Sequence, residues 1–504
     1  MRVWGALVLA LLAGLAAVVL RPRAPRTEAE ARARLLQGKP APGDLNVVLV
    51  TIDTLRADRL GCYGFAGIET PEIDRLAREG VLFERVTTAV PLTLPAHASI
   101  FTGLLPPHHG VRDNGGFFLD ASKTTLAERL RGAGYATGAF VGAWVLESKW
   151  GLARGFDTYA DKFDLSKYRV ISLGTVQKKG DEVMDGALAW LETVRKRKFF
   201  AWVHLYDPHT PYDPPEPYRS RHPGEPYLGE VAYTDHVVGR LLDWLRNGGL
   251  MERTLVVLTA DHGESLGEHG EATHGFFIYG STTQVPLIVR TPWGHRGRNR
   301  SPVASVDIFP TVLDLVGVAP EGAIDGRSLV RAVMDRAVEV GHASYVETYF
   351  PRYHFGWQHL RGLRDGVHQF VEAPRPELYD LEKDPGETTN VYKAYRRRAE
   401  ELSGTSSTPR PCSAWRPWAT SAARWRWTPG RSFRTPRTRS ASISSWTWPR
   451  EPPGRTGSRT PSRRCARSSP RIPRSSTRIS PWGIGWSRPH ARTRRSRSSS
   501  GSWP

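Results

Sequence analysis

The segment Asn46-Val-Val-Leu-Val-Thr51, which leads directly to Asp53, decides the fold class of this 504-residue chain. Its apolar, mostly β-branched residues form a continuous run, the pattern of a strand buried on both faces of a parallel sheet. Segments with helical periodicity, such as Asp181–Arg195 and Glu230–Arg246, lie between this run and others like it. Strands that alternate with helices predict an α/β fold with a mostly parallel central sheet flanked by helices. The other apolar runs are Ala139–Val141, Phe199–Leu205, Thr254–Thr259 and Val285–Val289.

This alternation extends over residues 45–335, which we expect to form one domain. Within it, Thr125-x-x-Glu128 has the pattern of a capping box that opens a further helix. After Asp335 the alternation weakens. Residues 336–403 include the motif ELYDLEKDPGE, and their pattern predicts hairpins in a small C-terminal antiparallel subdomain.

The chain opens with an 18-residue apolar run, Val3–Leu20, directly behind Arg2. This length suits a short transmembrane helix or a long signal-peptide core. Three arginines follow within six residues and no clear small-x-small cleavage site separates them from the run, so we expect residues 1–20 to be an uncleaved membrane anchor. A cleaved signal peptide is the alternative, and the flanking arginines leave the orientation open. The protein is then either anchored to a membrane by this one segment or exported to a periplasmic or extracellular space, and residues 21–44 form a polar linker.

The net charge of +20 comes from the last 101 residues. Residues 404–504 hold 22 of the 70 basic residues and only one of the 50 acidic ones, so the rest of the chain is close to neutral. This tail has no Leu or Val from which to build a core and is expected to be disordered. It nevertheless holds nine of the 17 tryptophans, which suggests a GC-rich gene read in the wrong frame. A basic, aromatic arm for nucleic acid or anionic lipid is the alternative. Because the body is neutral, no nucleic-acid partner is expected.

Two of the apolar runs end in groups that bind metals. The first leads to Asp53 and the fourth leads to Asp261-His262. Ligands gather at the carboxyl ends of parallel strands, so these side chains are expected to converge. Converging carboxylates and an imidazole predict a divalent-metal site, although each aspartate taken alone is also typical of a turn or a helix cap.

A third element is Val90-Pro-Leu-Thr-Leu-Pro-Ala-His-Ala-Ser-Ile-Phe-Thr-Gly103. Pro95 favours the first turn of a helix, which puts Thr93 just before the helix start. The backbone N–H groups and the dipole at a helix N-terminus favour a tetrahedral oxyanion. Thr93 is therefore either a simple N-cap residue or, beside a metal, a nucleophile.

In their order along the chain, these motifs resemble those of the sulfatase family, within the alkaline phosphatase superfamily. The resemblance extends from Leu45 to Glu387 and implies that residues 45–335 are a sulfatase-like catalytic domain. Thr93-x-Pro95-x-His97-x-x-x-x-Thr102-Gly103 falls on the family signature C/S-x-P-S-R-x-x-x-x-T-G. The other matching motifs are Thr51–Gly64, His109–Asn114, Asp207–Tyr212, Asp261–Glu264, Val285–Val289 and Glu377–Glu387.

The resemblance implies a role for each matching residue. It assigns the metal to Asp53, Asp261 and His262, with Thr93 bridging metal and substrate. His209 matches the histidine that contacts the ester or protonates the leaving group. The remaining positions are His97, a further catalytic candidate at the signature arginine, His274 at a substrate-binding lysine and Asn114 at a contact to substrate oxygens.

A second metal, as in nucleotide pyrophosphatase/phosphodiesterase relatives, would need Asp207, His209 and His274 as ligands. Four further residues in or near the motifs are interpreted as structural: Cys62, His108, His109 and His204.

Three departures from the family pattern bear on the reaction. The family nucleophile is a Cys or Ser that becomes formylglycine, and Thr93 cannot be converted in this way. His97 replaces the signature arginine, and the stretch Gly142–Trp150 lacks the family's Gly-Lys-Trp-His. The sequence therefore predicts a metal-dependent hydrolase that cleaves sulfate or phosphate esters through Thr93, with phosphate esters favoured and Ca²⁺, Mn²⁺ or Zn²⁺ as the metal. The alternatives are a phosphoryl-group transferase acting on a lipid or glycan, and a non-catalytic binding protein on a degenerate sulfatase scaffold.

Overall fold

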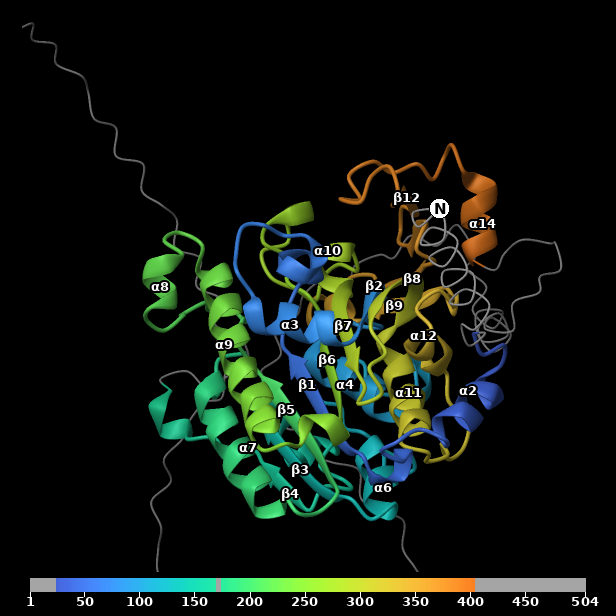
Figure 1. Ribbon diagram of the computed structural model, residues 1–504. Helices are drawn as coiled ribbons and strands as arrows, with labels where there is room; N and C mark the ends of the chain where they lie inside the picture. Colours follow the sequence, from blue (N-terminus) through green and yellow to red (C-terminus); the bar gives the residue numbers. More distant parts are fainter. Residues whose placement is uncertain (1–23, 169–173, 404–504) are drawn as a thin grey trace, which may run out of the picture. The chain divides into compact units, whose positions relative to one another are not determined.

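The computed structural model describes residues 24–168 and 174–403 (Figure 1). All the described residues belong to one compact unit. The apolar run at 3–20 and the basic tail at 404–504 lie outside the described residues. Within 24–168 and 174–403, no helix is both long enough and apolar enough to cross a membrane.

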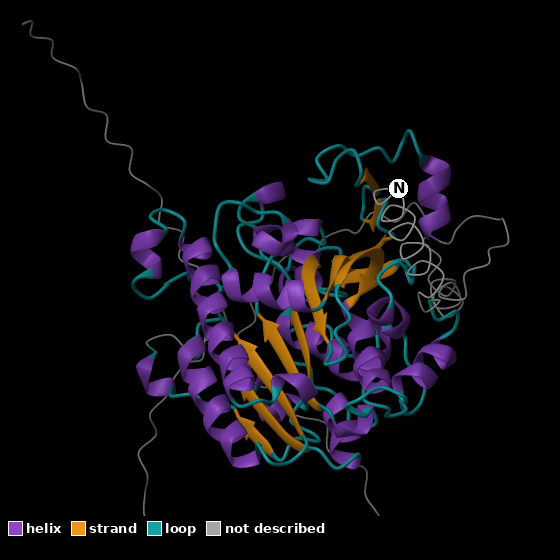
Figure 2. Cartoon of the chain, viewed as in Figure 1, coloured by secondary structure: helices purple, strands orange, loops and turns teal. Residues whose placement is uncertain are grey.

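An eight-stranded sheet forms the centre of the unit, in the order β4-β3-β5-β1-β6-β7-β2-β8 (Figure 2). The central strand β1 pairs in parallel with β5 on one side and β6 on the other. The predicted α/β fold with a mostly parallel sheet is therefore confirmed. The strands are β1 Asn46–Ile52, β2 Val81–Thr87, β3 Ala136–Val141, β4 Thr158–Ala160, β5 Phe199–Leu205, β6 Thr254–Ala260, β7 Gln284–Arg290 and β8 Gly297–Ala304.

One strand runs against the others, which the apolar runs did not indicate. β7 is antiparallel to both β6 and β2. The physical reason is the connection, because the loop and short helix after β6 stay at the carboxyl edge of the sheet and β7 starts from that edge. The strands β2 and β8 were missed in the sequence because charged residues interrupt their apolar patterns and both contain a register shift where they pair.

Helices cover the sheet in two groups. In the first group, α9 packs against both α3 and α7, α7 lies on β3 and β5, and α3 lies on β7, β2 and β8. The second group consists of α2, α4, α6, α11 and α12, in which α11 contacts each of the other four (Figure 1). The helix α6 begins with the predicted capping box, in which Thr125 and Glu128 each bind the other's backbone N–H. The helices are α2 Glu28–Leu35, α3 Pro71–Glu79, α4 Thr93–Thr102, α5 Pro106–His109, α6 Leu126–Gly132, α7 Gly180–Val194, α8 Tyr218–Arg221, α9 Pro226–Asn247, α10 Gly280–Thr283, α11 Ile308–Leu315 and α12 Val330–Met334.

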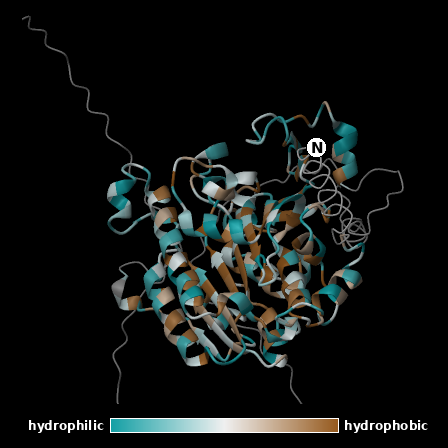
Figure 3. Ribbon diagram, viewed as in Figure 1, coloured by the Kyte–Doolittle hydropathy of each residue, from teal (hydrophilic) through white to brown (hydrophobic). Residues whose placement is uncertain are grey.

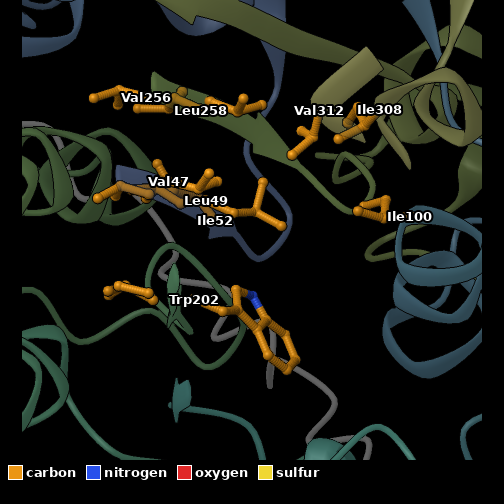
Figure 4. Close-up of a cluster of buried hydrophobic side chains, with 14 of the residues drawn as sticks. Val47, Leu49, Ile52, Ile100, Trp202, Val256, Leu258, Ile308 and Val312 are labelled. Atoms are coloured by element: carbon orange, nitrogen blue, oxygen red, sulfur yellow. The ribbon is translucent and has the colours of Figure 1, made fainter. Parts of the chain in front are cut away.

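The core lies on both faces of the parallel strands, as their continuous apolar runs require. Every residue of β1, β5 and β6 is buried, and the strands are hydrophobic where the outer helix faces are hydrophilic (Figure 3). Figure 4 shows the side chains of β1 between those of β6 and Trp202 of β5, with Ile308 and Val312 of α11 beside them. This packing fixes the strand ends, and therefore the side chains that follow them.

The segment predicted as a linker contains a helix in its described part. Ala31 and Leu35 of α2 lie four residues apart on one face and are buried in the main core. In addition, Arg32 Nε forms an ion pair with Asp314 Oδ1 of α11 at 2.8 Å. Part of the predicted linker is therefore a mostly polar helix that packs on the domain through two apolar side chains.

A second, four-stranded antiparallel sheet follows in the order β12-β11-β10-β9. Its presence confirms the small antiparallel C-terminal element that the sequence predicted. The bounds are β9 Ser344–Thr348, α13 Phe350–Phe355, β10 Leu360–Arg364, β11 His368–Glu372, β12 Glu377–Asp380 and α14 Arg396–Ser403.

Candidate active site

The carboxyl ends of β1, β5 and β6 bring together polar side chains that are fully buried. Asp53 follows β1, Asp261 and His262 follow β6, and His204 is the penultimate residue of β5, paired in register with Thr51. All of these acidic and imidazole side chains have zero solvent exposure. The sheet register thus produces the convergence that the sequence predicted.

Asp53, Asp261 and His262 form a compact group that can hold a cation. Each offers one ligand atom, and these atoms lie within 4.8 Å of one another. His262 Nε2 lies 3.5 Å from Asp53 Oδ1 and 3.6 Å from Asp261 Oδ2. The opposite ring nitrogen, Nδ1, donates to the carbonyl of Gly263 at 2.9 Å, so Nε2 keeps the lone pair that a metal needs.

The electrostatics of this group also fit a cation. Asp53 Oδ1 and Asp261 Oδ2 are buried and have no hydrogen-bond partner. Burial raises the pKa of both carboxyls; repulsion from Asp53 adds to the rise at Asp261, and repulsion from Glu264 adds to the rise at Asp53. Two buried, adjacent and unpaired carboxylates are costly unless a positive charge lies between them, and a divalent cation supplies it.

Thr93 lies beside this group. Its Oγ1 is 3.4 Å from Asp53 Oδ2 and 3.4 Å from His262 Nε2. The helix α4 begins at Thr93 itself; the N-cap residue is Leu92 and no side chain caps the helix, so the N-cap interpretation of Thr93 is wrong. The hydroxyl therefore faces the acidic group instead of a backbone N–H, at the positive end of a fully buried helix.

His97 lies one helical turn after Thr93 in α4 and is fully buried. Its Nδ1 donates to the carbonyl of Thr93 at 2.8 Å, and its Nε2 accepts from Thr51 Oγ1 at 3.0 Å. Thr51 Oγ1 in turn accepts from Trp202 Nε1 at 2.9 Å. Burial lowers the pKa of His97 to about 3, so the ring is neutral. The sequence placed His97 among the catalytic groups, but its contacts are those of a residue that holds the backbone of Thr93 in position.

His209 and His274 flank the group on its outer side. Their ring centroids are 5.1 Å apart, and the His274 ring is 4.4 Å from that of His262. His209 Nδ1 donates to the carbonyl of Thr210 at 2.5 Å, and its ring stacks on Tyr206. Burial lowers the pKa of both imidazoles, that of His209 to about 3.

The second predicted metal set is not brought together. Asp207 Oδ2 accepts the N–H of Gly180 at 2.9 Å, and its Oδ1 pairs with Lys179 Nζ at 3.2 Å. Its carboxylate is thus used by the start of α7, while His209 and His274 lie next to the first group. Within the described part of the chain, the groups with metal-ligand spacing are Asp53-Asp261-His262 and His97-His204-Asp261.

Asn114 reaches the helix that carries Thr93. Its Oδ1 accepts the N–H of Leu94 at 2.8 Å, and the side chain is half-buried. The amide therefore lies one residue from Thr93. His108 and His109 have partners of their own, Asp325 and Ser99, away from the acidic group.

Two residues of the site were missed as functional candidates. His204 Nε2 is buried without a hydrogen-bond partner, 3.5 Å from Asp53 Oδ2. The signal that could have found it is a histidine near the carboxyl end of an otherwise apolar central strand. Glu264 is also fully buried; its Oε1 lies 2.9 Å from His274 Nδ1, and its Oε2 accepts from the hydroxyl of Tyr212 at 2.9 Å.

Comparison with known families agrees with this geometry. Residues 45–318, more than half of the chain, match the family described as "Sulfatase". The chain belongs to the sulfatase family. Residues 267–403 also match a family described as "N-sulphoglucosamine sulphohydrolase, C-terminal".

Relatives of this sulfatase-family chain cleave esters, according to their names. N-acetylglucosamine-6-O-sulfatase of Bacteroides thetaiotaomicron is 25% identical over 478 residues, which cover 71% of this chain and 84% of the relative. An arylsulfatase of Clostridium perfringens is 26% identical over 454 residues, covering 71% and 92%. The structure of phosphonate monoester hydrolase of Agrobacterium radiobacter superposes with a TM-score of 0.61 at 25% identity, covering 72% and 94%. The chain is accordingly an ester-cleaving hydrolase of this family.

Proposed function

We propose that this protein is a metal-dependent hydrolase of sulfate or phosphate esters in which Thr93 is the nucleophile. One observation carries the proposal: Thr93 Oγ1 lies 3.4 Å from both Asp53 Oδ2 and His262 Nε2, in a buried group in which Asp53 Oδ1 and Asp261 Oδ2 have no hydrogen-bond partner. A merely structural threonine at a helix start would bind a backbone N–H, and this one does not.

Asp53, Asp261 and His262 would hold the cation, with Ca²⁺, Mn²⁺ or Zn²⁺ as candidates. When bound, such a cation supplies charge neutralisation for the substrate's oxygens and lowers the pKa of a nearby hydroxyl. The first N–H groups and the dipole of α4 add positive potential on the same side of Thr93.

In the proposed reaction, Thr93 Oγ1 gives its proton to Asp53 Oδ2, to which it donates a hydrogen bond, and forms a bond to the phosphorus or sulfur atom. The bond from that atom to the leaving oxygen breaks, and the electron pair and one proton end on the leaving alcohol. Water then attacks the Thr93 ester, which restores the hydroxyl and releases phosphate or sulfate. Water must do this because a threonine ester, unlike a formylglycine hydrate, cannot expel the anion by collapsing to a carbonyl.

His209 is the proposed proton donor to the leaving oxygen. Its Nδ1 is occupied by the carbonyl of Thr210, so Nε2 is the atom that exchanges a proton. Burial lowers the pKa of His209 to about 3 in the substrate-free protein. The negative charge of the bound substrate must therefore raise this pKa before His209 can act as an acid.

Phosphate esters are the preferred substrates in this proposal, because Thr93 replaces the residue that sulfatases convert to formylglycine. Among the similar proteins, the two sequence relatives named above are sulfatases and the superposed structure is a phosphonate monoester hydrolase. An anionic ester is the common feature. We also propose that residues 1–20 anchor the protein to a membrane or direct its export.

The test compares the wild-type protein with Thr93→Ala on an aryl phosphate, a phosphodiester, a phosphonate monoester and an aryl sulfate. We expect Thr93→Ala to lower kcat at least about a thousandfold on the preferred substrate. Thr102→Ala is the matched control, because Thr102 is equally buried in the same helix but donates to the carbonyl of Ala98. Wild-type rates for Thr93→Ala on every substrate would refute the nucleophile.

A further inference from the structure

Aromatic side chains are exposed in two segments close to the site. Four of the eight large apolar side chains that are exposed in the described part of the chain are Phe118, Tyr353, Phe355 and Trp357, which are 65%, 47%, 48% and 58% exposed. Contiguous exposed apolar surface beside a catalytic site commonly binds a ligand.

Tyr353, Phe355 and Trp357 are part of a set of packed rings, which Phe118 does not join. The ring centroids of Phe276 and Phe355 are 5.3 Å apart, those of Phe355 and Trp357 are 5.2 Å apart, and those of Phe276 and Trp357 are 6.0 Å apart. A second pair, Phe117 and Tyr353, lies at 5.4 Å. We call these five residues the aromatic patch.

Two short series of neighbouring residues connect the aromatic patch to the group formed by Asp53, Asp261 and His262, and to Thr93. Phe276 follows His274 by two residues, and the His274 ring is 4.4 Å from the His262 ring. On the other route, Phe276 contacts Phe350 at 5.1 Å, and Phe350 packs in a cluster with Leu92, the residue before Thr93.

The backbone holds the patch in shape. Gly356 has a φ of 70°, a left-handed conformation that other residues rarely adopt, and it ends α13. In this turn, the N–H of Trp357 donates to the carbonyl of Pro351 at 3.1 Å, and the Trp357 ring packs against the ring of Phe355. The patch is therefore preorganised before a ligand arrives.

The polar side chains beneath the patch are engaged within the protein. His354 Nε2 lies 2.6 Å from Asp113 Oδ2. The guanidinium of Arg112 lies over the Tyr349 ring at 4.5 Å and 3.5 Å from Glu347 Oε1. A saccharide needs hydrogen-bond partners for its hydroxyls, whereas these groups already bind one another, so the patch suits an apolar face.

We propose that the aromatic patch binds the leaving alcohol of the substrate, and that this alcohol is a flat, apolar, fused-ring alcohol or phenol. This inference rests on the proposed function, because it deepens the substrate class of the same site. The three rings of Phe276, Phe355 and Trp357 have centroids 5.2 to 6.0 Å apart. Together they present a surface wider than one six-membered ring, which suits a fused-ring ligand. The fused rings stack on this surface while the anionic group lies at Thr93.

A matched pair of substrates isolates this contact. Phenyl and 2-naphthyl esters with the same anionic group release alcohols of similar acidity, so they differ mainly in ring size. We expect the full-length protein to have a higher kcat/KM for the naphthyl ester. Trp357→Ala should lower that preference about five- to tenfold, mainly through KM, because stacking is present in both the bound substrate and the transition state. Trp357→Phe should restore part of it.

Tyr395→Ala is the control, because Tyr395 is 47% exposed but lies outside the patch, and it should leave both values unchanged. Equal losses on the phenyl and naphthyl esters in Trp357→Ala would overturn the fused-ring assignment. A larger loss on a sugar 6-ester than on the naphthyl ester would overturn it as well.

A binding measurement separates this inference from the proposed reaction. Calorimetric titration of the 2-naphthyl ester into Thr93→Ala protein and into Thr93→Ala/Trp357→Ala protein needs no turnover. Weaker binding by the double variant, by a similar factor, supports the patch even if no ester is cleaved by the wild-type protein. Equal binding by the two proteins overturns the patch while leaving the nucleophile untouched.

Discussion

Asp53→Asn should stabilise the metal-free protein and, at the same time, abolish its stabilisation by metal. The ligand atoms of Asp53 and Asp261 lie within 4.8 Å of each other in a fully buried group. At an effective dielectric constant of about 20, two like charges at this distance repel by about 3 kcal/mol. The metal-free fold must either bear this repulsion or take up a proton to avoid it. Asparagine removes the cost, so at pH 8 the metal-free variant should be more stable than the wild type by up to about 3 kcal/mol.

With metal, the order of stability changes. At a free metal concentration of one hundred times the dissociation constant, the wild type gains about 2.7 kcal/mol. If the lost carboxylate weakens binding a hundredfold, the variant gains only about 0.4 kcal/mol at the same concentration. The assay is thermal unfolding after chelation, with and without added Mn²⁺, Ca²⁺ or Zn²⁺.

A suitable control for this experiment is Asp235→Asn, since Asp235 is also buried with a raised pKa but lies outside the acidic group. It should leave the metal response intact. Two results together would show that no cation is held between these carboxylates. Asp53→Asn would be less stable than the wild type without metal, and added metal would still stabilise it by as much as it stabilises the wild type.

Three further predictions concern single side chains. Thr93→Ser keeps a hydroxyl at the same place and should retain activity within about tenfold of wild type, measured as kcat/KM. His204→Gln should weaken metal binding about 10- to 100-fold in a calorimetric titration, since it removes an imidazole 3.5 Å from Asp53 Oδ2; unchanged affinity would contradict this. Burial raises the pKa of Asp235 to about 7, so the folded protein holds a proton that the unfolded chain releases near pH 4. Wild-type stability should therefore fall from pH 4 to 7, and Asp235→Asn should remove up to about 4 kcal/mol of that fall in unfolding measurements.

The sequence was sufficient for the parts of the fold and site that depend on local pattern. Continuous apolar runs identified β1, β5 and β6, and their carboxyl ends placed Asp53, Asp261 and His262 at one edge of the sheet. The predicted mostly parallel sheet follows from the same pattern. Strand direction is different, because the loop after β6 decides that β7 runs backward and no residue in β7 encodes this.

Other parts depend on contacts between distant segments, which a single sequence does not reveal. The carboxylate of Asp207 forms an ion pair with Lys179, 28 residues earlier. It therefore does not join His209 and His274 in a second set of metal ligands. His204 looked structural because an imidazole in an apolar strand usually packs in the core. The aromatic patch combines three segments, around residues 117, 276 and 357, whose rings meet only in the folded chain.

The neutral state of the surrounding imidazoles indicates how the site must handle an anionic substrate. Burial lowers the pKa of His97, His209 and His274, so none of them carries a positive charge toward the ester in the substrate-free protein. His97, at the position of the signature arginine, is instead part of an uncharged chain of hydrogen bonds that ends at the backbone of Thr93. In the proposed reaction, a cation held by Asp53, Asp261 and His262 would then neutralise the substrate's charge together with the N-terminus of α4. The proposal that Thr93 is activated by the same cation, rather than replaced by a cofactor formed from the side chain, is consistent with this distribution of charge.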